Sequence, residues 1–277
     1  MKARPGRYHC APFLLLFLAT SACASTAAAN RAVPHRWPAG TEIAYVLTNG
    51  QTQTISIPGQ GEQVLTAETT FELLLTGREA STFTLTVQRA DSRDDAAAMG
   101  GDAPDITDVI GLESVITLDS RGHIASATGL DENRYVIDQG GVPSFHDLLQ
   151  ILFLPLPEGR LEEGTAWTRE YSYPIDQLDG THLELSFIDR YVCRELTEYE
   201  GTPAWLIEVT SEAAVTGTGD DIGVGMSGSG TAVIHAAEGS AMILSAEMET
   251  ALEGTVSIPG MDLPLTMHFR RAARIRE

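Results

Sequence analysis

The sequence predicts a mainly β protein: antiparallel sheet from two similar halves, curved around or packed on one helix at about residues 144–154. The first observation is alternation. In STFTLTVQ (81–88) every second residue is apolar, and the residues between are polar. The same period of two recurs in residues 181–192 and 263–269. Strands that bury one face and wet the other are typical of antiparallel sheets.

Turn signals between these segments are the second observation. Asn-Gly and Asp-Gly pairs suit tight hairpins because both central residues can take positive φ. Two segments that hold little that can pack, residues 90–108 and 215–230, are predicted as loops or flexible hairpin ends. The turn pairs are Asn49-Gly50, Pro58-Gly59, Arg121-Gly122, Asp179-Gly180, Glu200-Gly201, Glu238-Gly239 and Pro259-Gly260.

The third observation is one helix signal in SFHDLLQILF (144–153). Ser144 and Asp147 have the spacing of a capping box, and Pro155 ends the segment. A strongly apolar helix in a β protein must be covered by a sheet, and the space between them is either a cavity or a filled core. On the cavity interpretation, the side chains predicted to bind a ligand are Phe145, Leu149, Leu152 and Phe153.

The amino terminus has the order of an export signal: a basic start, an apolar run at residues 11–19 and then small residues. The apolar run is too short to span a bilayer as a helix. The stretch LATSAC resembles a bacterial lipobox, with Thr20 where that motif prefers Leu, so Cys23 is the predicted lipidation site. Cleavage after Ala24 or Ala29 by an ordinary signal peptidase remains the alternative.

These signals divide the chain into a signal peptide (1–23), a flexible tether (24–36) and a β-rich domain (37–277). The domain is predicted to hold two repeats, about 37–140 and 160–277, joined by the helical segment. Three collinear pairs of segments support the duplication. They are 38–48 with 162–172, 77–87 with 199–209, and 116–128 with 232–244.

The strong negative charge of the chain limits the partners that it can bind. The chain has a formal net charge of -20, and removal of Lys2, Arg4 and Arg7 with the signal makes the mature charge more negative still. Such a protein repels nucleic acid and anionic membrane surfaces, so we expect no nucleic-acid partner and membrane contact only through a lipid anchor. Cys193 is the one cysteine of the predicted domain, and its place in an alternating strand predicts a small core residue.

Motifs for chemistry are missing from the sequence. It has no H-E-x-x-H, no phosphate loop and no dinucleotide fingerprint, and GMSGSG (225–230) departs from G-x-S-x-G. The aspartates of 91–108 do not match a calcium loop. We therefore predict no metal, no cofactor and no catalytic residue, although carboxylates or histidines that converge only on folding are invisible at this level.

Two further segments carry a family resemblance: EEGTAWTREYSYP (162–174) and GSAMILSAEMETALEG (239–254). With Cys23 they resemble uncharacterised secreted and lipoprotein families of Gram-negative bacteria. The architecture is also similar to envelope carriers of the lipoprotein-localisation type, in which an open sheet covers helices. This resemblance implies an exported protein, periplasmic, anchored to the outer membrane or secreted, and it implies no catalytic residues.

Three functions follow as hypotheses. The first is a non-enzymatic envelope protein that binds a lipid, another apolar ligand or an envelope protein in a cavity between sheet and helix. The second is a structural or assembly component of the envelope with a filled core. The third is a hydrolase whose site forms only on folding. The sequence leaves the oligomeric state open.

Overall fold

The computed structural model describes residues 37–79, 81–94, 106, 109–129, 149–176, 182–219 and 222–276. These residues belong to one compact unit, Arg31–Glu277. The predicted signal peptide, Cys23, the tether and Phe145 lie outside the described residues.

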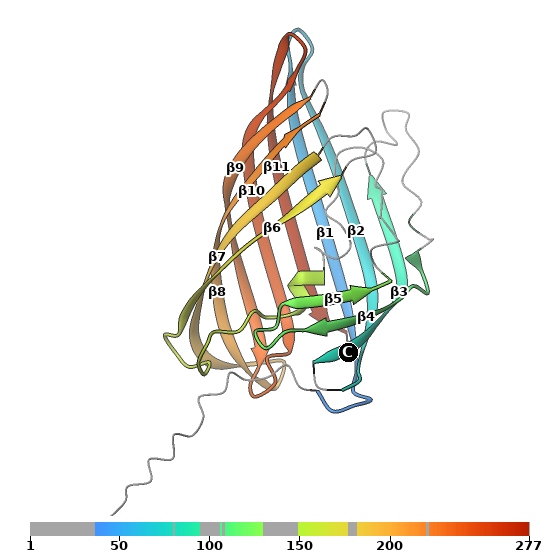
Figure 1. The fold of residues 1–277 in the computed structure, drawn as a ribbon, viewed down its shortest axis with the longest axis vertical. Coiled ribbons are helices and arrows are strands. Elements are labelled where there is room, and N and C mark those ends of the chain that lie inside the picture. Colours follow the sequence, from blue (N-terminus) through green and yellow to red (C-terminus); the bar gives the residue numbers. More distant parts are fainter. Residues whose placement is uncertain are drawn as a thin grey trace, which may run out of the picture. The chain divides into compact units, whose positions relative to one another are not determined.

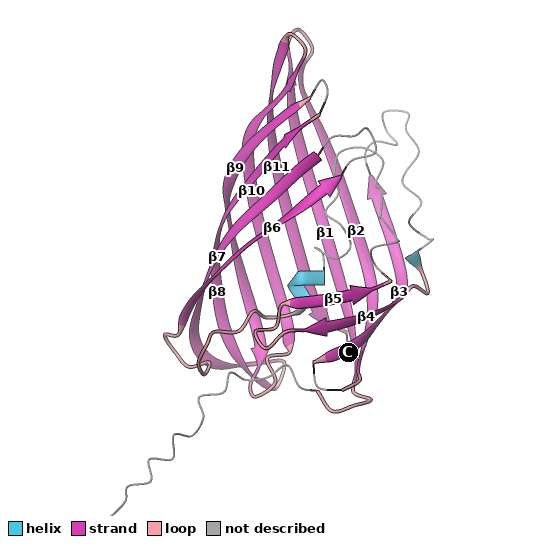
Figure 2. Cartoon of the chain, in the orientation of Figure 1, coloured by secondary structure: helices cyan, strands magenta, loops and turns pink. Residues whose placement is uncertain are grey.

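One antiparallel sheet of 11 strands forms the fold, in the order β5-β4-β3-β2-β1-β11-β10-β9-β8-β7-β6 (Figure 1). The predicted mainly β, antiparallel fold is confirmed, and strands dominate the described chain (Figure 2). The first and last strands pair at the centre, so β5 and β6 are the two edges. The strands are β1 (Glu42–Ile57), β2 (Gly61–Gly77), β3 (Thr82–Asp94), β4 (Glu113–Leu118), β5 (Ile124–Thr128), β6 (Ala166–Asp176), β7 (His182–Tyr199), β8 (Thr202–Thr218), β9 (Gly223–Ala237), β10 (Ile243–Ile258) and β11 (Met261–Ile275).

The predicted helix at 144–154 is not supported. Residues 144–148 lie outside the described residues, and the next ones make a 3-10 turn, η3 (Gln150–Leu152). Phe153 has extended backbone (φ -126°, ψ 116°) and forms an isolated antiparallel bridge with Met242. The chain then continues without helical structure past Pro155. We call residues 149–158 the strap, and the side of the sheet on which the strap packs the strap face.

The strap is buried on two sides. Leu149, Leu152 and Phe153 join the core formed by β1–β4, whereas Leu154 and Leu156 join the core formed by β7–β10. The first part of the strap therefore fills one half of the sheet, and the part after Phe153 fills the other. A helix would place an apolar stripe along one side only, so the extended conformation follows from the need to fill both cores.

The sheet curls around the strap. A flat sheet of eleven strands would separate its edges by about 48 Å at the usual strand spacing of about 4.8 Å. Here two adjacent strap residues reach both edges. The Leu156 amide donates to the carbonyl of Arg121, in the β4–β5 turn, at 2.7 Å. The Trp167 indole N–H of β6 donates to the carbonyl of Pro155 at 2.9 Å.

Of the two segments predicted as loops or flexible hairpin ends, the run 215–230 is largely strand, whereas most of 90–108 lies outside the described residues. Residues 90–94 complete β3, and the glycine-rich run 215–230 supplies the end of β8 and the start of β9. The predicted duplication stays a prediction. Its paired segments fall on β1 and β6, on β3 and β8, and on the β4–β5 and β9–β10 hairpins. No helix in the described ranges is both long and apolar enough to cross a bilayer.

Candidate functional site

A band of buried polar side chains crosses the strap face. On β7, Asp189 lies between the core residue Tyr191 and the apolar Phe187; on β8 and β10, Ser211 and Thr250 hold equivalent places. Buried polar groups are costly unless they are paired, so a band of them inside an apolar face marks a specialised region. The band consists of Asn49, Thr69, Asp189, Ser211 and Thr250.

Asp189 is the charged centre of the polar band and is 1% exposed. Ser211 Oγ donates to Asp189 Oδ1 at 2.6 Å, and the Tyr191 hydroxyl donates to Asp189 Oδ2 at 3.1 Å. Burial raises the pKa of Tyr191 far above its usual value, and the charge of Asp189 adds to the effect. Tyr191 therefore remains a hydrogen-bond donor to the carboxylate at all ordinary pH values.

Two arginines approach the polar band from opposite sides. Arg169 of β6 is the register partner of Asp189, stacks over the Tyr171 ring at 4.2 Å and donates to Gln150 Oε1 of the strap at 2.9 Å. Arg271 of β11 donates from Nε to Asn49 Oδ1 at 3.2 Å. Both arginines are half-buried.

A cavity of about 40 Å³ lies between the strap and the sheet where these groups meet. That volume holds one or a few water molecules. Arg169, Arg271 and Asp189 line it together with apolar side chains such as Phe153 and Met248. We call it the arginine cavity.

Beyond the polar band, toward the strand ends, the strap face becomes apolar again. We call this surface the strand-end cluster; its described members come from six strands, β7 to β11 and β1. The buried members are Leu185, Ala213, Val215, Met226, Leu252, Leu265 and Met267, and the partly buried ones are Ile55, Leu183, Phe187, Val224, Val256 and Phe269. Along the strands, the strap face therefore has three zones in order: the core around the strap, the polar band and the strand-end cluster.

On the other side of the sheet the same strands are polar. Because side chains alternate between the two faces, the neighbours of the strand-end cluster point to the outer face. They include Thr52, Thr54, Ser56, Thr66, Glu68, Ser227, Ser229, Glu253, Thr255, Ser257 and Thr266. A hollow of about 530 Å³ crosses β9, β10, β11, β1 and β2, but its lining residues Glu68, Glu249, His268 and Arg270 are all exposed.

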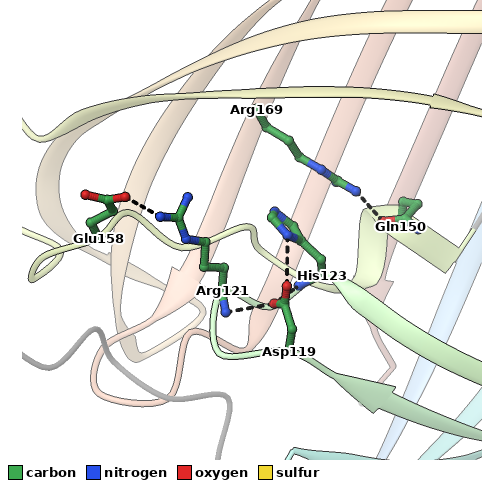
Figure 3. A network of polar contacts seen from close by, with 6 residues as sticks. All are labelled: Asp119, Arg121, His123, Gln150, Glu158 and Arg169. Carbon is green, nitrogen blue, oxygen red and sulfur yellow. Dashed lines mark hydrogen bonds and ion pairs between the residues drawn. The ribbon is translucent and has the colours of Figure 1, made fainter.

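A second polar group lies at the meeting point of the two sheet edges (Figure 3). Asp119 Oδ1 accepts hydrogen bonds from the backbone amides of Arg121 and His123, at 2.8 and 2.9 Å. Its Oδ2 lies 3.2 Å from Nδ1 of His123. Arg121 pairs with Glu158 of the strap. These residues line or adjoin a cleft of about 340 Å³ that also includes Arg169 and Trp167.

The environment shifts both titratable groups of this pair. Burial opposes ionisation of Asp119, but the two backbone hydrogen bonds and His123 outweigh it, and the pKa falls below its usual value. The pKa of His123 is also lowered, first by burial and then by the positive charge of Arg169, against the attraction of Asp119. His123 is therefore neutral at pH 7, with a ring nitrogen free to act as a base.

The cleft offers few groups for chemistry besides this pair. Its lining holds one hydroxyl, Thr168, and no Ser or Cys among the residues that the structure describes. Within the same described ranges, no three His, Cys, Asp or Glu residues converge as metal ligands would. Cys193 is buried as predicted, and burial raises the pKa of its thiol to about 11, with Glu163 adding to the shift.

The residues predicted to bind a ligand are placed as follows. Leu149, Leu152 and Phe153 are buried in the core between strap and sheet, and among them only Phe153 lines the arginine cavity. Sequence reasoning missed Arg169, Asp189 and Arg271. The sequence did hold a sign of Asp189. It occupies the same alternate positions of its strand as Leu185, Phe187 and Tyr191, so a charged residue stands where the pattern predicts an apolar one.

Comparison with known proteins gives no family. No known protein family and no curated protein matches the chain. Among solved structures, a lipovitellin studied for its lipid–protein interactions aligns with TM-score 0.45 and 10% identity over 87% of this chain. The chain spans 26% of the length of that lipovitellin chain.

Two other solved structures are more distant. DynF from the dynemicin biosynthesis pathway of Micromonospora chersina aligns with TM-score 0.21 and 7% identity, over 86% of this chain and 82% of its own. An outer membrane channel from Pseudomonas putida F1 aligns with TM-score 0.21 and 11% identity, over 87% and 97%. At these scores the likeness carries no assignment of function.

Proposed function

We propose that this chain is a non-enzymatic envelope protein that binds an apolar or amphiphilic ligand on the strap face, against the strand-end cluster. One observation carries the proposal: the adjacent strands β7 to β11, with Ile55 of β1, present apolar side chains on this face, and the other face carries mainly hydroxyls and carboxylates. The polar side suits water, and the apolar area that the partly buried members of the cluster leave accessible favours an apolar ligand.

The partly buried members of the strand-end cluster are the side chains that a ligand would contact. Phe187, Val256 and Phe269 keep part of their surface accessible, although they neighbour fully buried residues. Each methylene of an acyl chain that packed against them would contribute about 0.8 kcal/mol. A lipid tail therefore gains from this surface without displacing the strap.

The proposed ligand surface differs from the first expectation. Leu149, Leu152 and Phe153 fill the core formed by β1–β4, and removing them from it would expose that interior. The binding surface moves along the strands to residues such as Leu183, Met226 and Val256. Phe145 lies outside the described residues and remains a proposed contributor.

The cellular location of the protein is also part of the proposal. Export by the amino-terminal signal and lipidation of Cys23 would hold the domain at the envelope, where lipids are the abundant apolar ligands. Membership of a bacterial secreted or lipoprotein family remains a proposal on the same basis.

A fluorescent fatty acid tests the binding surface. We expect uptake by the mature domain, because the probe gains fluorescence on entering an apolar site. Val256→Glu introduces a charge on the strap face and should weaken uptake at least tenfold, since desolvating a carboxylate beside a lipid tail is costly. Thr255→Glu, one residue away on the outer face, is the matched control and should bind as the wild type does. Equal binding by both variants, or none by the wild type, contradicts the proposal.

A second candidate function, hydrolysis, is favoured by one observation. His123 and Asp119 lie within hydrogen-bond reach of each other in a cleft, and a neutral histidine held by a carboxylate is a suitable general base for water. Turnover of short-chain esters that disappears in His123→Ala, but survives in the control His182→Ala, would support it. The absence of turnover in the wild type would contradict it.

A further inference from the structure

The arginine cavity has a charge imbalance. Its lining includes two arginines, Arg169 and Arg271, and one acidic residue, Asp189. One carboxylate faces two guanidinium groups, so the cavity carries one uncompensated positive charge in a chain whose formal net charge is -20. A half-buried site of this kind favours one monoanion.

The arginines have donors to spare. A guanidinium has five N–H donors. Here Arg169 donates to Gln150 and also hydrogen-bonds to the Tyr191 side chain, and Arg271 donates to Asn49. These contacts fix the two side chains at the cavity and leave further N–H groups for a ligand. Paired N–H groups of arginine match the two oxygens of a carboxylate.

The position of the cavity sets the ligand class. It lies on the strap side of the polar band, and the strand-end cluster begins on the other side of that band. On β7 the order along the strap face is Tyr191, Asp189, Phe187; on β11 it is Arg271, Phe269, Met267. Along β11, the guanidinium residue Arg271 is therefore two residues, or about 7 Å, from Phe269, the first residue of the apolar cluster on the same face.

We propose that Arg169 and Arg271 bind the carboxylate of an amphiphile, so that the ligand of this protein is a long-chain fatty acid with its tail on the strand-end cluster. The inference rests on the proposed function and adds the head group to it. Arg271 and Arg169 act as specificity residues: they distinguish an acid from an uncharged lipid of the same length. The cavity's small volume suits a head group and excludes the tail.

Displacement of a fluorescent fatty acid by palmitate and by 1-hexadecanol measures the head-group preference. The wild type should bind palmitate at least tenfold more tightly than the alcohol, the usual effect of a charge-assisted hydrogen bond. Arg271→Gln and Arg169→Gln should each reduce this ratio toward one, while the affinity for the alcohol stays the same. Arg271→Lys should keep part of the preference, because it keeps the charge.

Arg270→Gln is the control for the displacement assay, because Arg270 is exposed on the outer face of the same strand. It should leave the ratio unchanged, and circular dichroism should show the same sheet signal in every variant. Equal affinity of the wild type for acid and alcohol overturns the head-group assignment and leaves the proposed function intact. A preference that survives in the Arg169→Gln, Arg271→Gln double variant overturns it too. Binding of neither lipid overturns both proposals.

Discussion

Phe153→Ala tests whether the strap is a structural core or the wall of a ligand cavity. Phe153 is 2% exposed, packs on Phe83 at 5.7 Å between ring centroids and bridges to Met242 through its backbone. Truncation of a buried phenylalanine costs about 3–5 kcal/mol, through lost transfer free energy and the cavity left behind. We expect the free energy of unfolding to fall by that amount.

Urea denaturation followed by tryptophan fluorescence measures the change, because Trp37 and Trp167 lie in or against the two cores. Val233→Ala is the control: Val233 is 43% exposed, so its truncation should change stability by less than about 0.5 kcal/mol. A loss below about 1 kcal/mol for Phe153→Ala would refute the filled core. Recovery of stability on adding a fatty acid would show that ligand, and not the strap, occupies this space.

Four other variants, one of them a control, test the fold and its electrostatics. Gly228→Ala should destabilise by about 1–3 kcal/mol in urea denaturation, because its Cβ would overlap the carbonyl of Ala251, whereas Gly225→Ala has open space and should be neutral or stabilising. Tyr45→Phe should cost about 1–3 kcal/mol, since the buried hydroxyl donates to the carbonyl of Ile243 at 2.8 Å; an unchanged midpoint would contradict that bond. His123 has a lowered pKa, so the folded state resists its protonation, and stability should fall as pH drops below about 6.5. His123→Gln should lose less stability than the wild type between pH 7 and pH 5. Parallel curves of unfolding free energy against pH for the two proteins would contradict a lowered pKa of His123.

Alternation predicted most of the sheet because it reports a local property, which face of a strand is buried. Phe83, Leu85 and Val87 are fully or nearly buried along β3, and Leu265 and Met267 behave likewise on β11. The order of the strands was beyond prediction, because the pairing of β1 with β11 joins residues more than two hundred positions apart.

The strap shows why a short apolar run is ambiguous. Residues 148, 149, 152 and 153 have helical spacing, yet the run 149–156 supplies side chains to two cores in turn. Periodicity alone does not separate these cases in a segment of about ten residues. The glycine-rich run at 215–230 failed for a different reason. Gly228 and Gly230 occupy strap-face positions where a Cβ would meet the backbone of β10, so glycine there permits strand packing and does not break it.

The candidate site was visible only in fragments. Asp189 occupies a position that alternation assigns to the buried face, which marks it in the sequence. Nothing in the sequence placed Arg271 in the same cavity, since β11 and β7 are not neighbours in the sheet. His123 and Asp119 form a local pair four residues apart, whereas the effect of Arg169 on His123 requires the sheet edges to meet.

Native mass spectrometry of the mature protein, purified gently from its own envelope, tests the central claim most directly. The account predicts a folded protein that carries one amphiphile, released by organic solvent and identified as a carboxylic acid. A clean mass with no adduct, together with no uptake of added palmitate, would contradict binding on the strap face and leave a structural role with a filled interior.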